Sequence, residues 1–130
     1  MKKTVSVIMC AYNEEATIRK VFKKLKALDY ITEIITVDNG SKDNTYRIML
    51  EARKENDKIK IFQIKKNKGL GHGLKLAIQN TTGDIVIRQD ADLEYDPDEM
   101  YNLVAQIENG NADVVYGSRM LGHDQALCFF

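Results

Sequence analysis

Three carboxylates alternate with other residues directly after a short apolar segment. Asp90, Asp92 and Glu94 follow the segment 85–87, which predicts a buried strand. Side chains two residues apart on an extended chain point the same way, so these carboxylates are expected to converge just past the carboxyl end of that strand. Ligands of open α/β sheets bind there. Hard oxygen ligands suit Mg²⁺ or Mn²⁺ together with substrate phosphates. The spacing therefore predicts a metal–diphosphate site.

A calcium loop or a helix cap could also produce an acidic run of this kind. A calcium-binding EF-hand loop starting at Asp90 needs glycine at its sixth position and glutamate at its twelfth, where this chain has Tyr95 and Tyr101. Helix capping explains Asp96, which precedes Pro97 as an N-cap would. It does not explain the two aspartates further upstream, so the motif alone leaves a metal site and an ordinary acidic loop equally open.

The composition limits the class of protein. The chain has 130 residues, enough for a single domain, 1–130, with one core. Its 19 basic and 19 acidic residues balance, which argues against a nucleic-acid partner. Two cysteines, Cys10 and Cys128, make no disulfide framework and favour a reducing, cytoplasmic setting. The basic N-terminus lacks a signal-peptide pattern, and no segment approaches the about 20 apolar residues of a membrane span.

Apolar segments of strand type and helix type alternate along the chain. The expected strands are 4–11, 33–37, 59–64, 85–87 and 113–116, and the expected helices are a first one capped by Asn13 and then 45–54, 74–80 and 97–108, the last stopped by Gly110. Such alternation predicts an α/β fold with a mostly parallel, Rossmann-like sheet and helices on both faces.

Polar segments follow the predicted strands and are expected to meet at one edge of the sheet. They are 11–14, 38–41, 90–92 and 117–119, with the loop 67–73 as a fifth. The loop has Gly69, Gly71 and Gly73 but Leu74 where a dinucleotide fingerprint needs glycine, and it follows the third strand rather than the first. NAD binding is therefore disfavoured. A loop whose backbone and Lys68 approach a sugar or diphosphate is favoured, with a plain flexible turn as the alternative.

These segments together resemble family 2 glycosyltransferases, and in particular the branch with dolichyl-phosphate mannose synthases and related polyprenyl-phosphate glycosyltransferases. The matching segments are VSVI at 5–8, AYNEE at 11–15, EIITVDNGSKDNT at 33–45, NKGLG at 67–71, TGD at 82–84, DADLEYDP at 90–97 and VVYGSR at 114–119. The resemblance covers almost the whole chain in order.

The resemblance implies a GT-A fold, a nucleotide-binding α/β half followed by an acceptor half. It implies inverting transfer of a sugar from a GDP- or UDP-sugar to a polyprenyl phosphate. The implied metal, Mn²⁺ or Mg²⁺, is held by Asp90, Asp92 and Glu94. Asp92 and Arg119 are the implied catalytic residues, Arg119 lying near the reacting phosphates, where a guanidinium is the favoured partner. The predicted nucleotide-sugar site comprises Ala11, Tyr12, Glu14, Asp38, Asn39, Lys68, Gly69, Asp90 and Ala91.

Two departures from the family pattern qualify this prediction. Asn39 stands where the family usually has a second aspartate that accepts a hydrogen bond from the nucleobase, so the base stays open. Family members also usually run further, which suggests a catalytic domain incomplete at its C-terminus. The apolar tail 126–130 is expected to self-associate, and the full-length protein to lie at the cytoplasmic membrane face. The alternatives are a nucleotide-sugar-binding domain without turnover and transfer to a saccharide hydroxyl.

Overall fold

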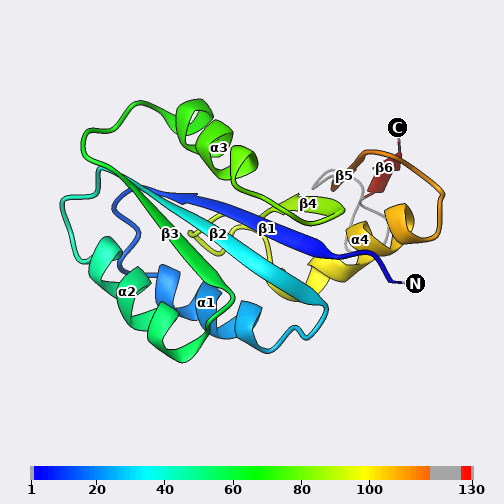
Figure 1. The fold of residues 1–130 in the computed structure, drawn as a ribbon, viewed down its shortest axis with the longest axis horizontal. Helices are drawn as coiled ribbons and strands as arrows, with labels where there is room; N and C mark the ends of the chain where they lie inside the picture. Colours follow the sequence, from blue (N-terminus) through cyan, green and yellow to red (C-terminus); the bar gives the residue numbers. More distant parts are fainter. Residues whose placement is uncertain (1, 118–126, 130) are drawn as a thin grey trace.

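Four parallel strands form one sheet in the part of the chain that the structure describes, with β1 and β2 at its centre (Figure 1). The structure is a computed structural model that describes residues 2–117 and 127–129. The strand order is β3-β2-β1-β4, with β1 at Val5–Ala11, β2 at Ile31–Asn39, β3 at Ile59–Ile64 and β4 at Ile85–Arg88. Strands β1 and β2 are almost continuously apolar and buried, as strands covered on both faces must be.

Helices cover both faces of this sheet, as the sequence predicts. Helices α1 (Ile18–Lys26) and α2 (Thr45–Glu55) bury their apolar side chains against one face, where Val7 and Met9 lie. Helix α3 (Leu70–Gln79) lies on the opposite face and packs through Ala77 against Ile8 and Ile35 (Figure 1). The alternation of β1 side chains between the two core clusters follows from the two-residue period of a strand. The α/β fold with a parallel sheet is confirmed.

The predicted helix 97–108 consists of a short 3₁₀ turn, η1 (Pro97–Glu99), followed by helix α4 (Met100–Glu108), and the predicted cap at Asp96 and stop at Gly110 are both present. The Asp96 side chain accepts a hydrogen bond from the Asp98 N–H, 3.0 Å apart, as an N-cap does. At the other end Gly110 has a φ of +74°, and Asn111 N–H donates to the carbonyl of Gln106. This is the Schellman arrangement that a glycine permits.

Two predicted helix starts are wrong. Helix α1 begins at Ile18 rather than after Asn13, because Asn13 adopts a left-handed φ of +52° and turns the chain. Helix α3 begins at Leu70, so Gly71 and Gly73 lie in its first turns rather than in a loop. Glycine is a poor helix former, which hid this start. Close packing explains Gly73, since a Cβ there would collide with the Cys10 Sγ.

The strands at the end of the chain also differ from the prediction. The sequence predicts a buried β4, but this strand borders only β1 among the described residues, and Val86 is 41% exposed. Strand β5 (Val115–Gly117) pairs antiparallel with β6 (Leu127–Phe129) in a separate two-stranded sheet. The end of β5 therefore does not join the carboxyl edge of the parallel sheet. Part of the predicted apolar tail lies outside the described residues. None of the described helices is long and apolar enough to cross a bilayer.

Candidate functional site

The three predicted metal ligands come together just beyond strand β4. One carboxylate oxygen from each of Asp90, Asp92 and Glu94 lies within 4.8 Å of the others. The strand pairing continues one residue past β4, because Gln89 N–H donates to the carbonyl of Ile8 at 3.0 Å. Asp90 is thus the first residue to leave the sheet. The convergence predicted from the alternating spacing is present.

A buried amide holds the acidic loop in shape. Gln89 is only 2% exposed, and its Nε2 donates to the carbonyls of Asp90 at 3.1 Å and Tyr95 at 2.7 Å. Leu93 turns the chain with a φ of +66°, and Glu94 N–H donates to Asp92 Oδ1 at 3.1 Å. The loop therefore folds back on itself, which brings the carboxylates to one place.

The charges around the loop are crowded. Burial, followed by the negative charge of Asp92, raises the pKa of Glu14, so a fourth carboxyl group lies near the three. Arg88 Nε donates to Asp90 Oδ1 at 2.9 Å and supplies one positive charge. Oxygen ligands of this number and spacing suit a hard divalent cation that also binds phosphates. The residues present therefore fit Mg²⁺ or Mn²⁺.

The loops after β1 and β2 are joined by hydrogen bonds beside this acidic loop. Asn13 N–H donates to Ser41 Oγ at 2.9 Å, and Lys42 N–H donates to Asn13 Oδ1 at 2.8 Å. The Thr17 hydroxyl donates to the carbonyl of Ala91 at 2.5 Å, which ties the start of α1 to the acidic loop. Loops from three strands therefore form one connected surface.

Asp38 and Asn39 end strand β2 and are both buried. Ser41 N–H donates to Asp38 Oδ1 at 3.1 Å, and Gln63 Nε2 lies 3.5 Å from Asp38 Oδ2. Asn39 instead contacts the loop before α3, with hydrogen bonds to the main chain of Lys68 and Gly69. The side chain of Asn39 is thereby committed to holding another loop.

The carboxyl edge of the sheet collects every described residue of the predicted nucleotide-sugar site. These are Ala11, Tyr12, Glu14, Asp38, Asn39, Lys68, Gly69, Asp90 and Ala91. Tyr12 is 41% exposed, whereas Ala11 and Ala91 are buried. Arg119 lies outside the described residues.

The sequence pattern did not predict the contacts that Arg88, Gln89 and Thr17 make with the acidic loop. Arg88 stands two residues before Asp90 on an extended segment, so the same alternation rule could have placed it beside the carboxylates. Gln89 carried a weaker signal, a single uncharged polar residue between Arg88 and Asp90. Thr17 had none, because its partner Ala91 lies 74 residues away.

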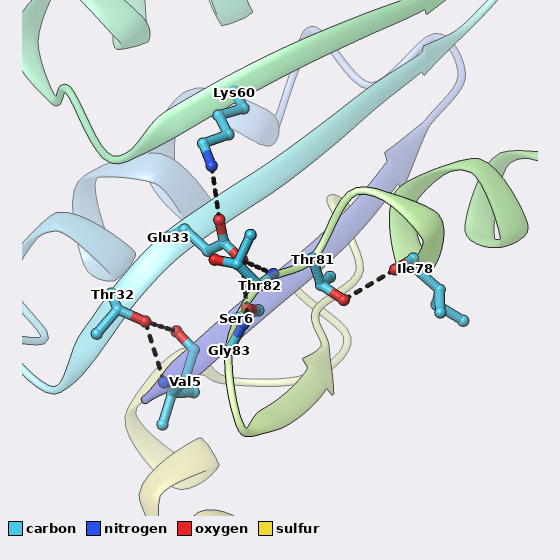
Figure 2. A network of polar contacts seen from close by, with 9 residues as sticks. All are labelled: Val5, Ser6, Thr32, Glu33, Lys60, Ile78, Thr81, Thr82 and Gly83. Carbon is cyan, nitrogen blue, oxygen red and sulfur yellow. Dashed lines mark hydrogen bonds and ion pairs between the residues drawn. The ribbon is translucent and has the colours of Figure 1, made fainter. Parts of the chain in front are cut away.

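A second acidic group lies at the opposite, amino end of the sheet. Figure 2 shows Glu33 of β2 surrounded by donors from other elements: the Ser6 hydroxyl, the Thr82 N–H and hydroxyl, and Lys60 Nζ at 2.8 Å. Burial alone would raise the pKa of Glu33, but these hydrogen bonds outweigh it and hold the value at about 2. This carboxylate is satisfied within the protein.

The family model for glycosyl transferase family 2 matches residues 6–125, nearly the whole chain. The chain belongs to glycosyl transferase family 2. The match includes the loops after β1, β2 and β4 that carry the polar surface. The protein also resembles solved structures of glycosyltransferases with the GT-A fold.

Three of these solved structures illustrate the similarity. The mannosyltransferase PcManGT from Pyrobaculum calidifontis, in complex with GDP-Man and Mn²⁺, is 27% identical, with a TM-score of 0.66 over 71% of this chain and 28% of that one. TarS of S. aureus is 27% identical, with a TM-score of 0.72 over 96% and 39%.

Glucosyl-3-phosphoglycerate synthase of M. tuberculosis in complex with UDP is 27% identical, with a TM-score of 0.75 over 93% of this chain and 46% of that one. The same synthase is known with Mn²⁺, UDP-glucose and phosphoglyceric acid. The chain spans less than half the length of each of these three proteins.

Proposed function

We propose that this protein is a metal-dependent, inverting glycosyltransferase that moves a sugar from a GDP- or UDP-sugar to a polyprenyl phosphate. The observation that carries the proposal is the cluster of carboxylate oxygens from Asp90, Asp92 and Glu94 within 4.8 Å of one another. Two structural relatives support it, since one is known with GDP-Man and Mn²⁺ and the other with UDP-glucose and Mn²⁺.

The donor diphosphate would bind at the acidic loop. Asp90, Asp92 and Glu94 would hold Mn²⁺ or Mg²⁺, which when bound neutralises charge that develops on the leaving diphosphate. Arg88 lies at the same place and can turn from Asp90 toward phosphate oxygens, for which a guanidinium is well suited. Arg119, next to β5 in the sequence, is proposed as a second cation for the reacting phosphates.

The nucleoside would lie on the loops after β1 and β2. Tyr12 is 41% exposed and offers a ring on which a base can stack. Asp38 is buried at the end of β2 with its carboxylate turned toward the Ser41 loop, where it can accept from a nucleoside. Lys68 and the backbone of Gly69 would approach the diphosphate or sugar from the loop before α3.

A lipid phosphate acceptor removes the need for a general base. Its second pKa is about 6, so it arrives as an anion. His72 is exposed on α3, and the proposed reaction does not use it as a base. The attacking phosphate oxygen would form a bond to the anomeric carbon while the bond to the donor diphosphate breaks, with inversion. The resemblance of the segments 90–97 and 114–119 to polyprenyl-phosphate glycosyltransferases supports this acceptor, and peripheral association with the cytoplasmic membrane face would follow.

A transfer assay tests the proposal against its alternatives. The protein is incubated with Mn²⁺, radiolabelled GDP-mannose or UDP-glucose, and either a polyprenyl phosphate or a free saccharide. We expect label in the lipid fraction, lost in Asp92→Asn and retained in Asp29→Asn, a matched change before β2 and away from the acidic loop. Label in the saccharide alone would show that the acceptor is a saccharide hydroxyl and not a lipid phosphate. Nucleotide-sugar binding without any transfer would identify a binding domain.

A further inference from the structure

Asn39 joins two parts of the chain that are 29 to 30 residues apart. It is the last residue of β2 and only 2% exposed. Its Nδ2 donates to the carbonyl of Gly69 at 2.9 Å, and its Oδ1 accepts from Lys68 N–H at 3.2 Å. One side-chain amide thus pairs with a donor and an acceptor on adjacent residues of the loop before α3.

The backbone around Asn39 is packed as closely as its side chain is bonded. Gly40 has a φ of +77°, and a Cβ there would lie 2.6 Å from the Asn67 N. On the helix side, a Cβ at Gly73 would lie 3.8 Å from Asn39 Nδ2. The loop 66–69 therefore lies directly against the end of β2, and it has little freedom to move while the amide holds it.

We propose that Asn39 is a positioning residue that fixes the Lys68–Gly69 loop at the nucleotide site, and that it does not select the nucleobase. This inference rests on the proposed nucleotide-sugar function only for its consequence, the placement of Lys68 near the donor diphosphate. The bonding itself is a property of the ligand-free chain. A substitution of Asn39 should therefore change the affinity for nucleotides with different bases by the same factor.

The two bonds require a side chain that both donates and accepts. An ionised aspartate at position 39 would keep an acceptor for Lys68 N–H but would place negative charge against the Gly69 carbonyl. A protonated aspartate carries one donor and one acceptor, as asparagine does, and would restore both bonds. Asn39→Asp should therefore make the loop sensitive to pH.

The test measures hydrogen exchange of the Lys68 and Gly69 amides in the ligand-free protein between pH 5 and pH 7.5. The native chain should show protection factors that change little with pH. In Asn39→Asp the protection factors of both amides should fall about tenfold at pH 7.5, because the lost bond to the Gly69 carbonyl releases the loop that carries them. Protection should return at pH 5. That recovery also shows that the variant is folded.

Asn67→Asp is the matched control in the same loop. Asn67 Oδ1 only accepts from Gly69 N–H, at 2.7 Å, and aspartate keeps that acceptor, so protection should stay native at every pH. The ionisable side chains on the elements around residue 39 are Cys10 on β1, Glu33 and Asp38 on β2, Lys60 on β3, Lys65, Lys66 and Lys68 in the loop, and His72 and Lys75 on α3. They are common to all variants, so the native profile accounts for them.

Nucleotide affinity separates positioning from base selection. At pH 7.5 with Mn²⁺, Asn39→Asp should lower the affinities for GDP and for UDP by the same factor, about 3- to 10-fold. A change in the order of GDP and UDP with native Lys68 and Gly69 exchange would overturn the inference, as would pH-independent native exchange in Asn39→Asp. If the native chain binds neither nucleotide, the proposed function fails while the exchange result still decides the role of Asn39.

Discussion

The two ends of the parallel sheet treat their carboxylates in opposite ways. At the amino end Glu33 is 4% exposed and accepts hydrogen bonds from Ser6, Thr82 and Lys60 (Figure 2). At the carboxyl end Asp90, Asp92 and Glu94 crowd together, and Asp92 helps to raise the pKa of nearby Glu14 after the larger effect of burial. The first carboxylate is neutralised by the protein itself. The second group is arranged for a cation that must come from outside.

The carboxylate at the amino end should therefore contribute to stability, and the cluster at the carboxyl end to ligand binding. A buried carboxylate with donors at both oxygens ties β1, β2, β3 and the turn before β4 together, so it should matter for folding. A cluster at the surface gains little from the protein and should matter for ligands. Substitutions at the two ends test this division, beginning with the largest expected effect.

Removing the Glu33 carboxylate should cost the most stability. Glu33→Ala leaves the buried Ser6 hydroxyl and the Thr82 N–H without their acceptor, and such losses cost about 3–5 kcal/mol. Urea unfolding measures the change. Asp92→Ala is the control at the other end and should cost less than about 1 kcal/mol without metal. Equal losses at the two positions would contradict the division.

The pH dependence of unfolding should report Glu33. Its pKa falls from 4.5 to about 2 on folding, so its stabilisation is complete above pH 4.5 and is lost as the pH falls toward 2. The shift corresponds to about 3 kcal/mol. Urea unfolding at several pH values should show this loss in the native protein and a flatter profile in Glu33→Gln. Parallel profiles would show that Glu33 does not carry the acid sensitivity.

Local signals in the sequence predicted the carboxyl end of the sheet better than its amino end. The alternation of Asp90 with Asp92 predicted their convergence, and β3 has its predicted bounds of 59–64, because both depend on neighbouring residues. The sequence pattern places Glu33 only at the start of a strand. Its role could not be predicted, since its partners lie 27 and 49 residues away and are brought to it by strand register.

Packing between distant elements also explains the errors. The close approach of Cys10 explains why α3 contains Gly73, and no local pattern shows that contact. The exposure of β4 and the pairing of β5 with β6 depend on which strands become neighbours. The family resemblance supplied the proposed roles of the site residues, but it did not indicate the bond of Arg88 to Asp90.

Neutralising Asp92 should relieve the crowding at the carboxyl end. The pKa of Glu14 is raised by burial and then by Asp92, so Asp92→Asn should bring it back toward its ordinary value. A raised pKa on folding means that ionised Glu14 lowers stability as the pH rises through its unfolded pKa toward its folded one. This loss should shrink in the variant. NMR titration of the Glu14 carboxyl carbon measures the shift, and Asp57→Asn, at the amino end, should leave it unmoved.

The smallest effect is expected at Arg88. The Arg88 side chain is 46% exposed and pairs with Asp90, and such surface pairs contribute about 0–1 kcal/mol. Arg88→Gln frees Asp90 for a metal, so the affinity for Mn²⁺ without nucleotide should rise by up to about fivefold. Calorimetric titration with Mn²⁺ measures it. Weaker Mn²⁺ binding in this variant would show that Arg88 helps to build the metal site.

The carboxyl edge should hold a divalent cation together with a nucleotide diphosphate, and this is the central claim. Calorimetry with GDP and UDP, with Mn²⁺ and with EDTA, tests it most directly in the native protein, Asp92→Asn and Asp29→Asn. The account predicts Mn²⁺-dependent binding in the native protein and Asp29→Asn, and a loss of about 10- to 100-fold in a folded Asp92→Asn. Nucleotide binding that is unchanged by EDTA, or by Asp92→Asn, would contradict it.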